Sequence, residues 1–93
     1  MNVYLSKEAN DELHEILDYL EENWSINVSN NFLDKLIRVM DLLEDMPYSY
    51  PASEKNPGLR KCVITRRTIA FYRVDEVKQE VKILSIWDTR RDV

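Results

Sequence analysis

The chain has 93 residues, of which 44% are hydrophobic and 32% are charged, and its formal net charge at pH 7 is −4. This length provides for a single domain, residues 1–93, and the composition is typical of a globular protein rather than a disordered one. Because the chain has one cysteine and one histidine, an internal disulfide framework and a multi-thiolate metal site are excluded. We therefore expect neither a metal nor a cofactor.

The N-terminal residues and the hydropathy pattern argue against targeting and membrane segments. The first residues pass from a short apolar stretch to acidic residues, whereas a signal peptide begins with basic residues and continues with apolar ones. The apolar runs are far too short to span a membrane. We expect a soluble cytoplasmic protein that does not associate with membranes.

The two parts of the chain carry opposite charge. Residues 1–55 have a net charge of −8, and residues 56–93 have a net charge of +4. The acidic total argues against general affinity for nucleic acid, because neutralisation of phosphates drives such binding. The positive second part is open to two interpretations: a local basic surface, or acidic helix faces that basic strands merely balance.

The first half of the sequence predicts a strand followed by a helical hairpin. Residues 2–5 suit a strand, Ser6 suits the N-cap of a helix, and Ser25 suits the N-cap of a second helix. The first apolar stripe comprises Ala9, Leu13, Ile16, Leu17, Leu20 and Trp24. The second comprises Val28, Phe32, Leu36, Val39, Met40 and Leu43, widened by Leu33, Ile37 and Leu42. The short connection favours antiparallel packing of the two helices.

The second half predicts a loop and three strands. All three prolines and the single glycine lie within residues 47–58, which breaks the helical pattern. β-Branched and aromatic residues then fill residues 60–65, 68–74 and 80–87, with a tight turn at Arg66-Arg67. The predicted fold class is α+β, with the order β-α-α-β-β-β and the helical hairpin packed on one face of a mostly antiparallel four-stranded sheet.

Several single residues have a structural explanation that we prefer to a catalytic one. His14 suits a surface position, and the acidic residues of the first helix suit a solvated face. Cys62 suits the core, and strand alternation places Tyr72 there as well. Trp24 and Trp87 each end an apolar stripe, so we expect core or interface anchors rather than platforms for stacked bases.

Basic residues of the strand region are the candidates for binding. The set comprises Arg60, Arg66, Arg67, Arg73, Arg90 and Arg91, with Trp87 beside them. Arginine grips phosphate through two hydrogen bonds, so a metal-free ribonuclease could use such cations, and Arg60 and Arg90 are the candidates for a catalytic role. A ribonuclease also needs an acid and a base, and the sequence offers no convincing pair.

Several segments follow one another at characteristic spacing along nearly the whole chain. They are Ala9, Leu13, Ile16 and Tyr19-Leu20; Leu42-Leu43 with Met46-Pro47; Pro57-Gly58-Leu59-Arg60; Phe71-Tyr72-Arg73-Val74; and Val81 to Asp92. Their order and spacing resemble the RelE/ParE superfamily of toxins from type II toxin–antitoxin systems. RelE-like members cut mRNA in the ribosome, whereas ParE-like members lack that chemistry and, where a target is known, block DNA gyrase.

The resemblance is closer to the ParE branch. RelE-like active sites place lysines along the first strand after the helices, an arginine at the start of the next strand, and an arginine and a tyrosine near the C-terminus. The two lysine positions match Arg60 and Cys62, and the strand-start arginine matches Ile69. Arg90 could stand for the late arginine, but no tyrosine follows it. Most of the nuclease set is therefore absent.

The resemblance implies three hypotheses. We favour a non-enzymatic toxin of a plasmid-stabilisation module, which inhibits growth by binding a protein target such as DNA gyrase. A cognate antitoxin would hold it inactive in a toxin–antitoxin hetero-oligomer. The alternatives are a metal-independent, RelE-like endoribonuclease that cuts mRNA on the ribosome through Arg60, Arg66, Arg67 and Arg90, and a member that binds its partner but has lost toxicity.

Two expectations concern surfaces. A partner segment should present Lys or Arg to the acidic hairpin and Asp or Glu to the basic sheet. Arg60 and the segment from Trp87 to Asp92 should lie together at one end of the sheet and form a recognition surface.

Overall fold

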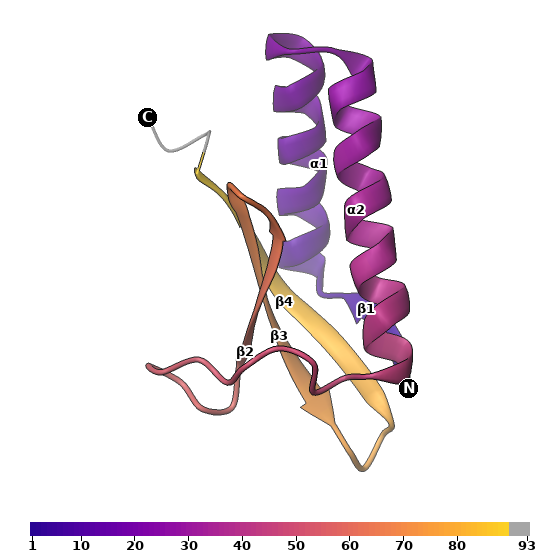
Figure 1. Cartoon of the computed structure of the whole chain (residues 1–93), viewed down its shortest axis with the longest axis vertical. Helices are drawn as coiled ribbons and strands as arrows, with labels where there is room; N and C mark the ends of the chain where they lie inside the picture. The colour runs from indigo at the N-terminus through magenta and orange to yellow at the C-terminus, as the bar shows by residue number, and fades with distance from the viewer. Residues whose placement is uncertain (90–93) are drawn as a thin grey trace.

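A helical hairpin lies against one face of a four-stranded sheet in the computed structural model, which describes residues 1–89 (Figure 1). The elements are β1 (Asn2–Leu5), α1 (Lys7–Asn23), α2 (Ile26–Asp45), β2 (Arg60–Thr65), β3 (Thr68–Asp75) and β4 (Glu80–Asp88). The predicted α+β class and the element order β-α-α-β-β-β are confirmed. The predicted bounds of the three C-terminal strands agree with the observed ones to within one residue.

Both helices begin at the serines that the sequence indicated. The Ala9 amide donates a hydrogen bond to Ser6 Oγ at 3.0 Å, and the Val28 amide donates one to Ser25 Oγ at 3.1 Å. Each serine thereby satisfies an amide that has no partner within its helix. Helices α1 and α2 run side by side as the antiparallel hairpin that their short connection predicts (Figure 1).

The strand order in the sheet is β1-β4-β3-β2. Strands β2, β3 and β4 form an antiparallel meander, with Cys62 opposite Ala70 and Ala70 opposite Ile86. Strand β1 pairs with β4 in the parallel direction. The hairpin between β1 and the meander allows this pairing, because a parallel connection needs a long crossover.

The core lies between the hairpin and the sheet. Ala9, Leu13, Ile16 and Leu20 of α1 and Phe32, Leu36 and Leu43 of α2 meet Cys62, Ala70, Tyr72, Val81, Ile83 and Ile86 of the sheet. Cys62 and Tyr72 are both fully buried, so the predicted core positions of both residues are confirmed. His14 is exposed, as expected.

Side chains at the N-terminal end of α1 form hydrogen bonds with the backbone of an irregular part of β4. The pairing with β3 shifts between Phe71 and Tyr72, which leaves Leu84 as an extra residue on β4. Ser6 Oγ donates to the Leu84 carbonyl at 3.0 Å, and the Ile86 amide donates to Glu12 Oε1 at 3.1 Å. The helix thus supplies partners for backbone groups that a bulge takes out of the ladder.

Two residues of the predicted apolar stripes are exposed, Ile37 of α2 at 46% and Trp24 at the end of α1. Trp24 was expected to continue the apolar stripe of α1, but it is 62% exposed. It lies at the C-cap, where φ is −128° and ψ is −87°, so it has left the helical path that the stripe follows. Among residues 1–89, neither helix combines the length and apolar character that a membrane crossing requires.

Candidate functional site

The described members of the predicted binding set lie on the three antiparallel strands and their first turn. Arg66 and Arg67 form the two-residue turn between β2 and β3, and Arg73 lies on β3; all three are exposed. Trp87, near the end of β4, is 54% exposed, which excludes the core alternative for this residue. Arg90 and Arg91 lie outside the described residues.

Arg60 is level with Tyr72 and Ile83, well before the end of β4 at Asp88, so the expected proximity is wrong for the described residues of the segment, 87–89. Arg60 is opposite Tyr72, whereas Asp88 is opposite Thr68. Because β2 and β4 are both antiparallel to β3, they run in the same direction, and the start of one cannot lie beside the end of the other. The neighbour of the β4 end is instead the arginine turn: the Thr89 amide donates to the Arg67 carbonyl at 2.8 Å.

Arg60 holds the loop between α2 and β2. Its Nη1 donates to the Tyr50 carbonyl at 2.6 Å, and its guanidinium carbon lies 4.7 Å from the centre of the Tyr48 ring. The Tyr48 hydroxyl donates to a carboxylate oxygen of Glu76, in the turn between β3 and β4. These contacts tie the loop to two parts of the sheet, so the Arg60 guanidinium already has partners within the chain.

A group of tyrosines and a thiol lies behind Arg60. The Tyr72 hydroxyl donates to the Pro47 carbonyl at 2.7 Å, and the rings of Tyr50 and Tyr72 meet edge to face at 6.4 Å. Burial raises the pKa of Tyr50 to about 12 and that of Cys62 to about 11, and it also raises the pKa of Tyr72. All three groups therefore stay protonated at neutral pH and cannot act as general bases there.

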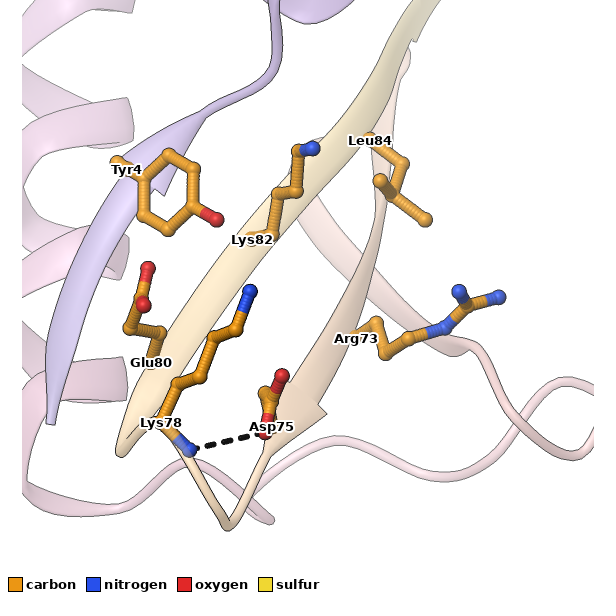
Figure 2. A pocket seen from close by; sticks show the side chains of 7 residues that line it. All are labelled: Tyr4, Arg73, Asp75, Lys78, Glu80, Lys82 and Leu84. Carbon is orange, nitrogen blue, oxygen red and sulfur yellow. Dashed lines mark hydrogen bonds between the residues drawn. The ribbon is translucent and has the colours of Figure 1, made fainter.

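A hollow of about 220 Å³ lies on the face of the sheet that the helices do not cover (Figure 2). Its lining residues are Tyr4, Arg73, Asp75, Lys78, Glu80, Lys82 and Leu84. The Lys82 ammonium lies 5.9 Å from the centre of the Tyr4 ring. Burial, followed by a hydrogen bond from its hydroxyl to the Glu80 carboxylate, raises the pKa of Tyr4, so this hydroxyl is a donor.

A second hollow, of about 510 Å³, lies beside β2. The loop residues Pro51 to Lys55 form one wall, and Lys61 and Phe71 form the floor. The loop reaches this position because the Lys61 amide donates to the Pro51 carbonyl at 3.1 Å and the Ser53 amide donates to the Leu59 carbonyl at 2.7 Å. The loop therefore follows the edge of β2 for a short distance.

The sequence missed several residues of this region. Tyr48, Tyr50 and Glu76 carried no signal, because their roles depend on contacts between segments far apart in the chain. Tyr4 and Lys82 could have been found, since strand alternation places both on the same face as Arg73 once β1 is known to pair with β4. The thiol and the two tyrosines behind Arg60 stay protonated at neutral pH, and the Glu76 carboxylate accepts the hydrogen bond of Tyr48, whose ring contacts Arg60.

Comparison with known proteins agrees with this architecture. The family model of the ParE toxin of the type II toxin–antitoxin system parDE matches residues 3–93. The fold is similar to that of a chromosomal ParDE toxin–antitoxin system from P. aeruginosa, with a TM-score of 0.79, 19% identity and 95% of each chain covered. It is also similar to the toxin–antitoxin complex RelBE2 from Mycobacterium tuberculosis, with a TM-score of 0.61, 17% identity and coverage of 94% of this chain and 95% of that one.

A YoeB/ParE toxin from Agrobacterium tumefaciens has a TM-score of 0.68 and 13% identity, over 95% of this chain and 98% of that chain. No curated protein matches the sequence.

Proposed function

Because this chain belongs to the ParE toxin family of type II toxin–antitoxin systems, we propose that it acts by binding a protein target rather than by cutting RNA. The proposed target is DNA gyrase, and the proposed outcome is growth inhibition. A cognate antitoxin would neutralise the toxin in a hetero-oligomer, as the P. aeruginosa and M. tuberculosis systems pair a toxin with an antitoxin.

The main support for this proposal is that Arg60 contacts the loop between α2 and β2. A nuclease would need this guanidinium to face the phosphate that changes during the reaction. Here its Nη1 donates a hydrogen bond to the Tyr50 carbonyl, and its guanidinium carbon lies over the Tyr48 ring. One N–H group and the ring contact of this guanidinium are therefore already engaged in holding the loop between α2 and β2.

The surroundings of Arg60 support the same proposal. The position on β2 that a RelE-like enzyme would fill with a second lysine is the fully buried Cys62, and the arginine position at the start of β3 is Ile69. Burial keeps the pKa of the nearby Tyr50 and Cys62 far above neutral pH. Neither Tyr50 nor Cys62 can therefore supply a general base beside Arg60 at neutral pH.

Controlled expression in a bacterial host tests the proposal. We expect the cells to become filamentous and to induce the response to DNA damage while protein synthesis continues. Purified chain added to translating ribosomes should leave the mRNA intact. Ribosome-dependent mRNA cleavage by the wild-type chain would contradict the proposal.

The Arg60→Ala variant separates a structural role for Arg60 from a catalytic one. We expect it to lose about 1 kcal/mol of stability, because a charged hydrogen bond and a cation–π contact are lost from a half-exposed position. This corresponds to a fall in Tm of roughly 4–8 °C. Well below that Tm, growth inhibition should match that of the wild type and of the control Arg38→Ala, whose side chain is exposed on α2.

A catalytic role predicts a different result. The folded Arg60→Ala chain would then lose activity by about 10²-fold or more, because a group that stabilises the transition state would be missing. Such a loss of activity in a chain that still folds would contradict a purely structural role for Arg60.

A further inference from the structure

The face of the sheet opposite the helices is organised in rows that run across the strands. The first row, nearest the arginine turn, holds Val63, Ile69 and Trp87. The second holds Lys61, Phe71 and Ser85. A third holds Arg73, Lys82 and Tyr4, and the last holds Asp75, Glu80 and Asn2.

The first row is an apolar patch that no described residue covers. Val63 is 56% exposed and Trp87 is 54% exposed, on either side of the half-buried Ile69. Phe71 continues the patch into the second row and is half-buried as well. Contiguous exposed apolar side chains of this kind are typical of surfaces that bind another molecule, and tryptophan is among the residues most enriched at energetic centres of interfaces.

Cations surround the apolar patch. Arg66 and Arg67 lie at one end of it, Lys61 lies in the next row, and Arg73 and Lys82 lie in the row after that. The carboxylates of Asp75 and Glu80 lie in the last row, and Glu54 of the neighbouring loop lines the hollow beside Lys61. We call the first three rows and the arginine turn the docking face.

The two hollows widen the docking face on both sides. The hollow of about 510 Å³ opens beside Lys61 and Phe71, and the hollow of about 220 Å³ opens beside Arg73 and Lys82 (Figure 2). In each hollow the cations outnumber the carboxylates: Lys55 and Lys61 accompany Glu54 in one, and Arg73, Lys78 and Lys82 accompany Asp75 and Glu80 in the other. Phe71 lines the first hollow and Leu84 lines the second. An extended segment that alternates apolar and acidic side chains could place both kinds of group along this face.

Charge decides among the candidate occupants. A second copy of the chain docked through the same face would bring two sets of cations together, because a two-fold interface pairs a patch with itself. A nucleic acid would meet these cations, but the chain as a whole is acidic, with a net charge of −8 over residues 1–55.

We propose that the docking face binds a segment of a partner protein that carries apolar anchors between Asp or Glu residues. The proposal rests on the proposed function only in treating the chain as a toxin that acts through protein partners. The anchors would cover Val63, Ile69 and Trp87, and the carboxylates would pair with Lys61, Arg73 and the arginine turn. Electrostatic complementarity would set the orientation, and the apolar row would supply most of the affinity.

The two tryptophans allow a direct test. The Trp24→Phe variant leaves Trp87 as the reporter in the docking face, and Trp87→Phe leaves Trp24, at the end of the hairpin, as the matched control. The probe is a short synthetic peptide in which Leu and Phe alternate with Glu and Ser. The comparison probes are the same peptide with Lys in place of Glu and a short single-stranded RNA.

We expect the acidic peptide to shift the Trp87 emission saturably and to leave the Trp24 emission unchanged. Replacing Lys61 and Arg73 together by Glu should raise its Kd by about tenfold or more, since the contacting charges would then repel. The control Lys35→Glu, an exposed change on α2, should leave the Kd unchanged.

Four results would overturn the docking face as proposed. They are binding of the lysine peptide as tightly as the acidic one, saturable binding of the RNA alone, a Trp87 shift caused by raising the concentration of the chain itself, and peptide binding that ignores the Lys61 and Arg73 changes. Filamentation of the host without peptide binding would reject the docking face and leave the proposed function standing. Peptide binding by a chain that never inhibits growth would do the reverse.

Discussion

Burial changes the chemistry of single side chains in this protein, as Cys62 illustrates. Its thiol is fully enclosed between β2 and the hairpin, and burial raises its pKa from the ordinary 9.0 to about 11. The pKa of the neighbouring Tyr50 rises from 10.0 to about 12, again mainly through burial. Deprotonation of either side chain is therefore less favourable in the folded chain than in the unfolded chain.

This difference predicts how stability depends on pH. In the unfolded chain the thiol loses its proton near pH 9, whereas in the folded chain it does so near pH 11. The contribution of Cys62 to the free energy of unfolding should be constant below about pH 9 and should fall as the pH rises from about 9 to about 11. Urea unfolding across this range measures the slope. In Cys62→Ala the part of the slope that begins near pH 9 should disappear, and an unchanged slope would contradict the assignment.

At the scale of elements, two serines with the same local role differ in their tertiary role. Ser6 and Ser25 both accept a hydrogen bond from the amide three residues ahead. Ser6 is 5% exposed and also donates to the Leu84 carbonyl at the β4 bulge. The N-terminus of α1 is thereby joined to the sheet, whereas the side chain of Ser25 caps its own helix.

The two caps make a matched pair of variants. Ser25→Ala should cost about 1 kcal/mol, the usual cost of losing an N-cap. Ser6→Ala should cost about 2 kcal/mol, because it also leaves a carbonyl at the bulge without its donor. Thermal unfolding should therefore show a Tm lower by roughly 4–8 °C for Ser25→Ala and by about twice that for Ser6→Ala. Equal losses would show that the bond to Leu84 contributes nothing.

At the scale of the whole molecule, charge is divided between the hairpin end and the sheet. Trp24 ends helix α1, whose C-terminal part carries Asp18, Glu21 and Glu22. Trp87 is opposite Ile69 of β3, the strand that follows the turn of Arg66 and Arg67. Each tryptophan is more than half exposed, so each one samples the local potential.

Ionic quenchers should detect this division. In the two single-tryptophan chains at low salt, iodide should quench Trp87 more strongly than caesium does, and caesium should quench Trp24 more strongly than iodide does. The difference should shrink at high ionic strength, because added salt screens exposed charges over about 10 Å at 0.1 M. The same iodide-to-caesium ratio for both tryptophans at low salt would contradict the division of charge.

The sequence by itself determined the elements, the fold class and much of the core. Helical spacing separated the buried from the exposed faces of α1 and α2, and strand alternation placed Cys62 and Tyr72 inside. These predictions succeeded because both periodicities depend only on backbone geometry over a few residues. The family followed from the order of the segments and agrees with the match over residues 3–93.

Only the tertiary structure decided which distant residues meet. In the folded chain Arg60 contacts the loop that contains Tyr48 and Tyr50. Asp88 lies beside the arginine turn and not beside Arg60, and Trp24 lies outside the core. The tertiary structure also brought Val63, Ile69 and Trp87 into one row through the register of β2, β3 and β4. A local pattern tells which side of an element is apolar. It does not specify strand order, register or the path of a loop, because these depend on contacts between segments that are far apart in the sequence.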